Sequence, residues 1–187
     1  MLNRLQVIDE TVLFFIQEHW KNPVLDHVMV FFTSLGNAGF LWITIAILLL
    51  FSKRYQKCSV LLLTSIFFSM FLGDEILKPL VGRIRPFDKF PTIELLIKSP
   101  GSFSFPSGHA MVGFSSATVL CYCNRRYGLI AYVLASLIAF SRIYLFVHYP
   151  SDTLGGVILG ILTAFLTIYI LNLVYSGIEK FHKKHLG

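Results

Sequence analysis

Charged residues are scarce in this chain of 187 residues. Asp, Glu, Lys and Arg make up only 14% of it, whereas 55% of the residues are hydrophobic and cluster in long runs. This composition excludes an ordinary soluble domain and is typical of membrane-spanning helices. The net charge of +6 forms no basic stripe for nucleic acid, because the Lys and Arg residues flank the apolar runs. We therefore expect an integral membrane protein with a single domain over residues 1–187, with no nucleic-acid partner and no evident protein partner.

Cysteine is also scarce. Cys58, Cys121 and Cys123 are an odd number with no evident pairing, so we interpret them as thiols rather than as a disulfide. Cys121 and Cys123 lack the further ligands that a zinc site requires. No internal repeat is present, and no signal peptide is apparent, because the apolar run at 12–16 is short and flanked by acidic residues.

The apolar runs predict an all-α integral membrane protein, a bundle of about five transmembrane helices. The predicted spans are residues 27–51, 58–80, 107–123, 127–148 and 152–175. Gly36, Asn37 and Gly39 interrupt the first span, which indicates a kink or a broken helix. Residues 3–20 predict an amphipathic helix that lies in the membrane interface or, alternatively, packs on the domain itself.

The links between the spans carry the orientation signal. With five spans, the loop 82–105 lies on one face and the polar tail 176–187 on the other. The second face has its basic residues in short links and the tail: Lys53, Arg54, Lys57, Arg125, Arg126, Lys180, Lys183 and Lys184. The positive-inside rule therefore predicts a cytoplasmic tail and an extracytoplasmic loop 82–105.

The stretch Ser141 to Asp152, SRIYLFVHYPSD, places three polar groups at the end of an apolar span. Ionisable side chains at membrane depth are costly, so each one indicates a functional site. His148 and Asp152 are one helical turn apart, so the carboxylate can hold one imidazole nitrogen and leave the other free. Arg142 can reach the same space and bind an anionic, phosphate-like group.

Two further polar clusters fall on the same predicted face. Lys78 and Arg85 follow the second span, and Ser107, Gly108 and His109 open the third. Each cluster alone has a structural explanation, since cations at span ends extend to headgroups, Pro-Ser-Gly is an ordinary helix start, and a lone histidine is often a core residue. Together the three clusters predict a phosphate-binding site.

These residues also match a known pattern. KPLVGRIRP (78–86), PSGH (106–109) and SRIYLFVHYPSD (141–152) follow Lys-x6-Arg-Pro, Pro-Ser-Gly-His and Ser-Arg-x5-His-x3-Asp, in order and without departure. In these motifs the chain resembles the type 2 phosphatidic acid phosphatase superfamily, which includes lipid phosphate phosphatases, glucose-6-phosphatase and vanadium haloperoxidases. The compact form is similar to small bacterial members, which implies a bacterial inner (cytoplasmic) membrane location with the site on the extracytoplasmic side.

The resemblance implies a role for each residue. His148 would attack phosphorus to give a phosphohistidine, Asp152 would hold its tautomer, and His109 would protonate the leaving oxygen and then activate water. The phosphate oxygens would be bound by Lys78, Arg85, Arg142, Ser107 and the Gly108 backbone N–H. Since three cations do what a metal does elsewhere, the resemblance implies no metal and no other cofactor.

Some residues near the motifs are open to two interpretations. Asp74 and Glu75 are expected to orient Lys78 rather than to react. Arg83 lies outside the pattern, and we expect it at lipid headgroups or a larger substrate. Phe87, Phe90, Phe103 and Phe105 are either a wall for a lipid tail or aromatic residues of the membrane belt. We expect His182 and His185 to be solvated rather than metal ligands.

The expected function is therefore a membrane phosphatase for a lipid phosphate or pyrophosphate. By resemblance the candidates are undecaprenyl pyrophosphate, phosphatidylglycerol phosphate, phosphatidic acid and the 1-phosphate of lipid A. The undecaprenyl-pyrophosphate phosphatase, phosphatidylglycerophosphatase B and lipid A 1-phosphatase groups are the most similar. The alternatives are a non-catalytic lipid-binding or transport protein on the same fold and a vanadate-dependent haloperoxidase.

Overall fold

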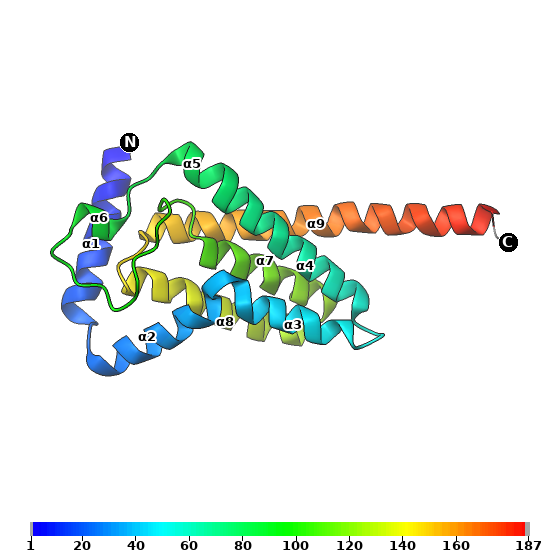
Figure 1. The fold of residues 1–187 in the computed structure, drawn as a ribbon, viewed down its shortest axis with the longest axis horizontal. Coiled ribbons are helices and arrows are strands. Elements are labelled where there is room, and N and C mark those ends of the chain that lie inside the picture. The colour runs from blue at the N-terminus through cyan, green and yellow to red at the C-terminus, as the bar shows by residue number, and fades with distance from the viewer. Residues whose placement is uncertain (1, 186–187) are drawn as a thin grey trace.

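Every regular element in residues 2–185 of the computed structural model is helical (Figure 1). The structure describes the backbone of these residues and the side-chain surroundings of residues 4–177. The long helices run roughly side by side, and α1 (Leu2–His19) crosses one end of them (Figure 1). The bundle consists of α2 (Pro23–Gly36), α3 (Phe40–Leu50), α4 (Gln56–Met70), α7 (Gly108–Cys123), α8 (Arg125–Tyr144) and α9 (Pro150–His185).

The first predicted span is a broken helix, as Gly36, Asn37 and Gly39 indicated. The Asn22 side chain accepts hydrogen bonds from the backbone N–H groups of Val24 and Leu25 and so caps α2. α2 ends at Gly36, and a 3₁₀ turn over Asn37–Gly39 leads into α3. Gly39 has φ 68° there, a left-handed conformation that glycine adopts without strain. The break brings the end of α2 beside the other helices at mid-bundle.

The second predicted span continues from α4 through a π-helical segment, η2 (Phe71–Leu77), into α5 (Lys78–Val81). Gly82, with φ 60°, ends α5. A π segment widens the helix by one residue and is frequent at functional sites. Here it carries Asp74, one turn before Lys78. The predicted loop 82–105 is irregular except for the short helix α6 (Pro86–Lys89).

α7 occupies the centre of the bundle and packs against α4, α8 and α9. Its residues from Ala110 to Leu120 are almost all buried. Small residues make this packing close: a Cβ at Gly160 of α9 would lie 2.2 Å from the Met111 backbone oxygen. Close approach of helices through small residues is a common way to pack a membrane bundle.

The fourth predicted span is too long at its C-terminal end. α8 begins after Asn124, whose side chain caps it, but ends at Tyr144 rather than at 148. A non-helical link of residues 145–149 follows, in which Phe146 has φ 61°. His148 is therefore in a link and not on a helix. α9 then begins at Pro150 and is helical to His185, beyond the predicted span end at 175, and the tail side chains from residue 178 on lie outside the described residues.

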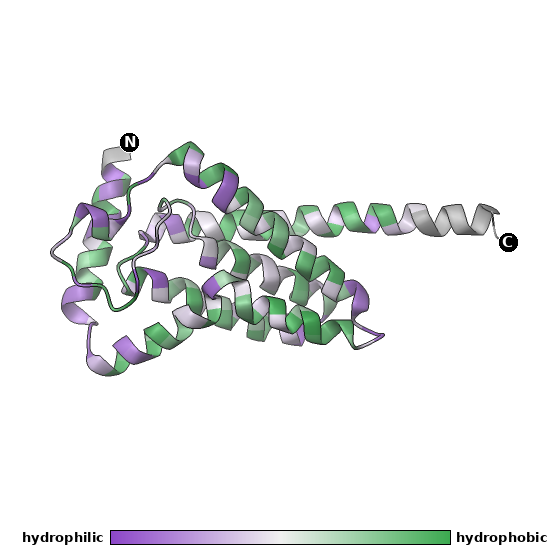
Figure 2. Cartoon of the chain, in the orientation of Figure 1, coloured by the Kyte–Doolittle hydropathy of each residue, from purple (hydrophilic) through white to green (hydrophobic). Residues whose placement is uncertain are grey.

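Four helical stretches in the described residues are long and apolar enough to cross a membrane: Pro23–Leu50, Gln56–Lys89, Arg125–Tyr144 and Pro150–Gly177. α7, the remaining predicted span, has 16 residues. At 1.5 Å per residue it is about 24 Å long, shorter than the hydrocarbon core of about 30 Å. Hydrophilic residues collect at the two ends of the bundle and hydrophobic ones between them (Figure 2), the pattern of a multi-pass membrane protein.

α1 packs on the end of the bundle with its polar face, although an amphipathic helix usually buries its apolar face. Asp9 is 1% exposed and Leu13 is fully buried, whereas Val7 and Ile8 are 62% and 58% exposed. The polar side of this amphipathic helix therefore faces the domain, and most of its apolar side is open. Such an arrangement combines the two interpretations that the sequence allowed, packing on the domain and an apolar face available to a membrane interface.

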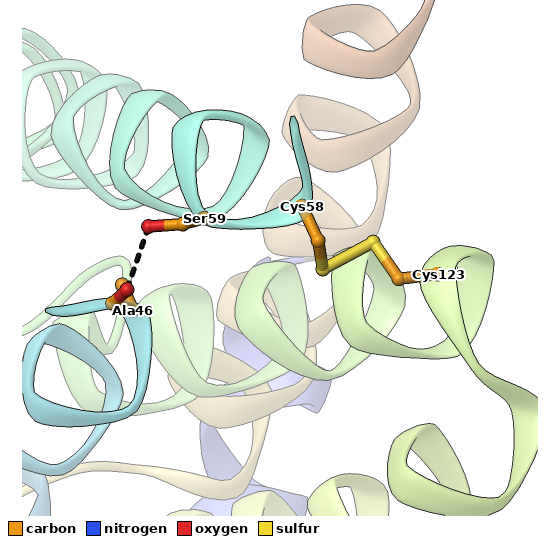
Figure 3. Close-up of a disulfide and its surroundings, with 4 residues drawn as sticks. All are labelled: Ala46, Cys58, Ser59 and Cys123. Carbon is orange, nitrogen blue, oxygen red and sulfur yellow. Dashed lines mark hydrogen bonds between the residues drawn. A yellow bond between two sulfur atoms is a disulfide. The ribbon is translucent and has the colours of Figure 1, made fainter. Parts of the chain in front are cut away.

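The interpretation of the cysteines as thiols is wrong for two of them. Cys58 and Cys123 form a disulfide between the start of α4 and the end of α7, with Cα atoms 6.0 Å apart (Figure 3). Cys121 is free. The pairing joins residues 65 positions apart, so only the packing of α4 against α7 reveals it. Beside the bridge, the Ser59 hydroxyl donates to the Ala46 carbonyl at 2.6 Å, which links α4 to α3 (Figure 3).

Candidate active site

The three predicted clusters meet at one cavity of about 200 Å³, where α7 begins and α8 ends. Its wall is formed by α2 and the 3₁₀ turn after it, by α4, η2 and α5, by α7 and α8, by the loop before α7 and by the link after α8. The polar lining residues are Asp74, Lys78, Arg85, Ser102, His109, Arg142 and His148. Three cations and two imidazoles around one small cavity form a site for a multiply charged anion such as a phosphoryl group.

Arg85 lies at the base of this site and is only 2% exposed. Its Nε donates to the Ser102 carbonyl at 2.6 Å and its Nη1 donates to the Val147 carbonyl at 2.7 Å. The same Nη1 lies 3.1 Å from His148 Nε2, which must be unprotonated to accept this hydrogen bond. The guanidinium group therefore favours the neutral, nucleophilic form of His148.

Lys78 is held by two partners at the mouth of the cavity. Its Nζ donates to Asp74 Oδ1 at 2.6 Å and to the Ser102 hydroxyl at 3.1 Å. The predicted orienting role therefore applies to Asp74. Glu75 is exposed, and the described residues include no contact between it and Lys78. Since the Ser102 hydroxyl also lies 3.2 Å from Arg85 Nη2, this serine fixes the spacing of two cations.

Arg142 comes from the last turn of α8 and is 3% exposed. Its Nη1 donates to the Thr33 hydroxyl of α2. Its Nε is buried with no hydrogen-bond partner in the described residues. Burial of a guanidinium N–H without an acceptor costs folding free energy. An anion that enters the cavity could accept this hydrogen bond and recover that free energy.

His148 and Asp152 are close but not in direct hydrogen-bond contact. His148 Nδ1 lies 3.7 Å from Asp152 Oδ2, and Nδ1 has no hydrogen-bond partner in the described residues. Asp152 Oδ2 instead accepts from the Ser104 hydroxyl at 2.5 Å and from the Tyr149 backbone N–H at 2.9 Å. The carboxylate is thus fixed beside the imidazole, and a small rotation of the ring would bring the two into contact.

His109 is on the opposite side of the cavity, in the first turn of α7. Its Nε2 lies 3.1 Å from Asn37 Oδ1 in the break between α2 and α3. Gly36 packs against the imidazole, because a Cβ at this position would lie 2.5 Å from His109 Cδ2. The broken helix therefore positions His109, a role that the sequence did not suggest.

The two phosphate-binding residues predicted beside His109 differ in position. Gly108 lines the cavity, as expected. Ser107 does not: it is fully buried, its hydroxyl has no partner in the described residues, and its backbone N–H donates to the Asp152 carbonyl at 3.1 Å. Its hydroxyl also makes no capping bond to α7, although Ser107 stands at the N-cap position. Phosphate binding by Ser107 stays a prediction.

Several supporting residues were missed from the sequence: Thr33, Asn37, Ser102 and Ser104. Thr33 contacts Arg142, and Asn37 contacts His109. Ser102 contacts both Lys78 and Arg85, and Ser104 contacts Asp152. Short polar residues in a loop or near a helix break look like ordinary turn residues, so no sequence signal separates them. The expectations for His182 and His185 lie outside the described side chains.

The predicted aromatic wall is mostly structural. Phe87 and Phe90 belong to hydrophobic clusters beneath α1, and the Phe90 ring is 5.0 Å from the Phe14 ring. Phe105 packs against Gly155 of α9. Phe103 is 46% exposed, so among these four it is the most accessible to a lipid tail or an interface. None of the four lines the cavity.

Replacing Gly36 with alanine is expected to lower kcat by about tenfold to a hundredfold, because the new methyl group displaces the His109 ring. KM should change little, since the cations are not touched. Steady-state hydrolysis of a lipid phosphate measures both constants. Gly177→Ala on α9, where a Cβ meets nothing within 4 Å, is the matched control. Equal activity of Gly36→Ala and wild type would mean that His109 needs no support from the helix break.

Comparisons with known proteins agree with this geometry. The fold and site define a helical membrane protein with a cationic, histidine-containing phosphoryl site, and no cluster of three or more His, Cys, Asp or Glu residues suited to a metal ion is found among the described residues. A protein-family model described as the PAP2 superfamily matches residues 59–175. The chain therefore belongs to the PAP2 superfamily and is a membrane lipid phosphate phosphatase.

Individual relatives cover most of the chain. An undecaprenyl-diphosphatase of Sulfolobus acidocaldarius is 31% identical over 159 residues, which are 84% of this chain and 76% of that protein. Phosphatidylglycerophosphatase B of Bacillus subtilis is 35% identical over 158 residues, which are 78% of this chain and 75% of that protein. A crystal structure of a transmembrane PAP2-type phosphatidylglycerolphosphate phosphatase from Bacillus subtilis has a TM-score of 0.74 at 31% identity, over 92% of this chain and 88% of that one.

Proposed function

We propose that this protein removes the terminal phosphate of an isoprenoid diphosphate or of phosphatidylglycerol phosphate through a phosphohistidine on His148. The observation that carries the proposal is the contact of Arg85 Nη1 with His148 Nε2, 3.1 Å apart, in a cavity that also receives Lys78 and Arg142. The contact supports the proposal because it requires an unprotonated imidazole nitrogen beside a cation that we expect to bind phosphate. The relatives named above act on lipids of these two kinds.

The first step is attack of His148 Nε2 on phosphorus. A phosphoryl oxygen takes over the Arg85 N–H that now points at Nε2, which frees the nitrogen lone pair as the phosphate binds. A P–N bond forms, the bond from phosphorus to the lipid-side oxygen breaks, and His109 gives its proton to that oxygen. Lys78, Arg85 and Arg142 stabilise the charge on the equatorial oxygens.

The second step returns the enzyme to its starting state. His109, now neutral, takes a proton from water as the water oxygen attacks the phosphohistidine. The P–N bond breaks, inorganic phosphate leaves, and His109 is again protonated. Asp152 stabilises the positive charge that the His148 ring carries between the two steps. The products are phosphate and a lipid alcohol or, from a diphosphate, a lipid monophosphate.

Phosphate release by the purified chain tests this function. The substrates are undecaprenyl pyrophosphate, phosphatidylglycerol phosphate, phosphatidic acid and lipid A, assayed in parallel in detergent with a chelator present. We expect release to be insensitive to the chelator, because Lys78, Arg85 and Arg142 supply the positive charge. A preference of a hundredfold or more for one lipid would identify the substrate. A requirement for magnesium, or no release from any lipid, would overturn the proposal.

We also propose that the site faces the extracytoplasmic side of a bacterial inner membrane. The basic links before α4 and before α8 lie at the end of the bundle away from the cavity and favour the cytoplasm for that end. The Cys58–Cys123 bridge at the same end favours the opposite orientation, because disulfides are rare in a reducing cytosol. Hydrolysis of a lipid added to the outside of intact spheroplasts decides between them: release there supports the proposed side, and release only after lysis contradicts it.

A further inference from the structure

The N-terminal helix α1 contributes a buried carboxylate to the region behind the catalytic site. Asp9 accepts from the Ser151 backbone N–H with Oδ1 at 2.9 Å and from the Ser151 hydroxyl with Oδ2. Oδ2 also accepts from Arg83 Nη2 at 2.7 Å. With the side chain only 2% exposed, this is not a surface ion pair. It attaches α1 to the first turn of α9, one residue from Asp152.

Arg83 stands between two carboxylates. Its Nη2 contacts Asp9 as described, and its Nη1 donates to Asp152 Oδ1 at 2.5 Å. The guanidinium carbon lies 4.1 Å from the centre of the Tyr149 ring, which fixes its plane. Arg83 does not line the cavity. Its guanidinium group binds Asp9 and Asp152 of the protein, in place of the expected lipid headgroup or substrate.

Arg83 holds Asp152 by a second route as well. Its backbone carbonyl accepts from the Ser104 backbone N–H at 2.8 Å, and the Ser104 hydroxyl donates to Asp152 Oδ2 at 2.5 Å. Both oxygens of the carboxylate are thus fixed directly or indirectly by this one residue. Since Asp152 Oδ2 is the atom that faces His148 Nδ1 at 3.7 Å, Arg83 controls the carboxylate that the nucleophile needs.

α1 also covers the link that carries the nucleophile. Leu13 packs with Phe146 and Tyr149, and Ile16 packs with Val147. The Gln17 side chain donates to the Tyr144 carbonyl at 2.8 Å, where α8 ends. The helix therefore lies against residues on both sides of His148.

We propose that Arg83 and Asp9 are positioning residues for the nucleophile, so that α1 is part of the active site and not only a membrane anchor. The inference rests on the proposed function, because it assigns to Arg83 and Asp9 the task of holding Asp152 against His148. Their charges also act on His148 with opposite signs. Arg83 offsets the negative charge of Asp152, and Asp9 offsets that of Arg83.

Opposite charges give opposite pH effects. Removal of Arg83 leaves Asp152 more negative, which favours the protonated imidazole, so the acid limb of kcat/KM moves to higher pH. Removal of the Asp9 charge leaves the positive charge of Arg83 less neutralised. This disfavours the protonated imidazole of His148, so the acid limb of kcat/KM moves to lower pH. The other charged or titratable groups near His148, Asp152 and Arg83 are the same in the Arg83 and Asp9 variants: Glu10, Asp74, Lys78, Arg85, Asp88, Lys89, His109, Arg142 and Tyr149.

The experiment uses the full chain in detergent with the lipid that the wild type hydrolyses fastest. Arg83→Met and Asp9→Asn should each lower kcat by about tenfold to a hundredfold with KM little changed, since neither residue lines the cavity. The acid limb should move by about half a pH unit to one unit, up for Arg83→Met and down for Asp9→Asn. Arg83→Lys, which keeps the charge, should leave the limb near its wild-type position.

Glu18→Gln is the matched control, because it removes one negative charge from an exposed residue of the same helix. Glu18 is not among the hydrogen-bond or ion-pair partners of Arg83 or Asp152 in the described residues. It should change neither kcat nor the acid limb. If the acid limbs of kcat/KM do not move, or move in the same direction in Arg83→Met and Asp9→Asn, the inference is overturned. The Asp9–Arg83 contact would then only attach α1 to the bundle. If Arg83→Met does not fold, Asp9→Asn and Arg83→Lys still decide. A wild type without activity would instead overturn the proposed function and this inference with it.

Discussion

Replacing His148 with alanine is expected to lower kcat by about 10⁴-fold or more, because removal of the proposed covalent nucleophile leaves only the contributions of substrate binding and electrostatic stabilisation. The lipid phosphate should still bind, since Lys78, Arg85 and Arg142 remain around the cavity. Arg85 keeps its bonds to Ser102 and Val147 in this variant. Phosphate release gives kcat, and equilibrium binding of the intact lipid to the inactive variant gives the affinity directly.

A histidine outside the cavity provides the control. His27 on α2 is exposed, and its ring nitrogen lies near the Pro23 carbonyl. His27→Ala should retain wild-type activity. Loss of lipid binding in His148→Ala together with loss of turnover would mean that His148 holds the site together rather than attacking phosphorus. Residual turnover within tenfold of the wild type would exclude the phosphohistidine.

The sequence was sufficient to find the cations and the two histidines that meet at the cavity, but not Ser102, which also lines it. Ionisable groups are so unfavourable in a membrane that Lys78, Arg85, Arg142 and His148 stand out from an apolar background. Their motifs fall at the ends of predicted spans, and helices that alternate in direction bring those ends to one face. The five predicted spans and the broken first helix follow from the same contrast between long apolar runs and Gly or Asn interruptions.

Contacts between residues far apart in the sequence could not be predicted from the pattern of apolar runs and polar residues. The Cys58–Cys123 bridge and the Asp9–Arg83 pair join positions 65 and 74 residues apart, and each depends on which helices are neighbours. α1 shows the limit most clearly. Its amphipathic pattern was identified from the sequence, but which side faces the domain is set by Arg83 and Ser151, whose positions only the fold defines.

The end of α8 is a further case. Apolar residues continue through Val147, so the apolar run predicts a span that reaches His148. The helix stops at Tyr144 because the Arg142 carbonyl accepts from the Val147 and His148 backbone N–H groups, at 3.2 and 3.3 Å, and the chain turns. This turn is what points His148 toward Arg85.

Replacing Arg85 with lysine is expected to lower kcat by about 10²- to 10³-fold, although the charge is kept. Arg85 uses three nitrogens at once, on the Ser102 carbonyl, the Ser102 hydroxyl and the Val147 carbonyl, while Nη1 also touches His148. One ammonium group cannot satisfy these acceptors and still hold a phosphate oxygen beside Nε2.

The kinetic split distinguishes positioning from charge alone. If Arg85 acts only as a positive charge, Arg85→Lys retains kcat, and this part of the mechanism is wrong. If the planar fork sets the distance between phosphorus and Nε2, kcat falls more than affinity, because binding by Lys78 and Arg142 persists while the attack geometry is lost. Arg125 is an exposed arginine at the start of α8, whereas the cavity lies at the end of this helix, so Arg125→Lys controls for the substitution itself and should behave as wild type.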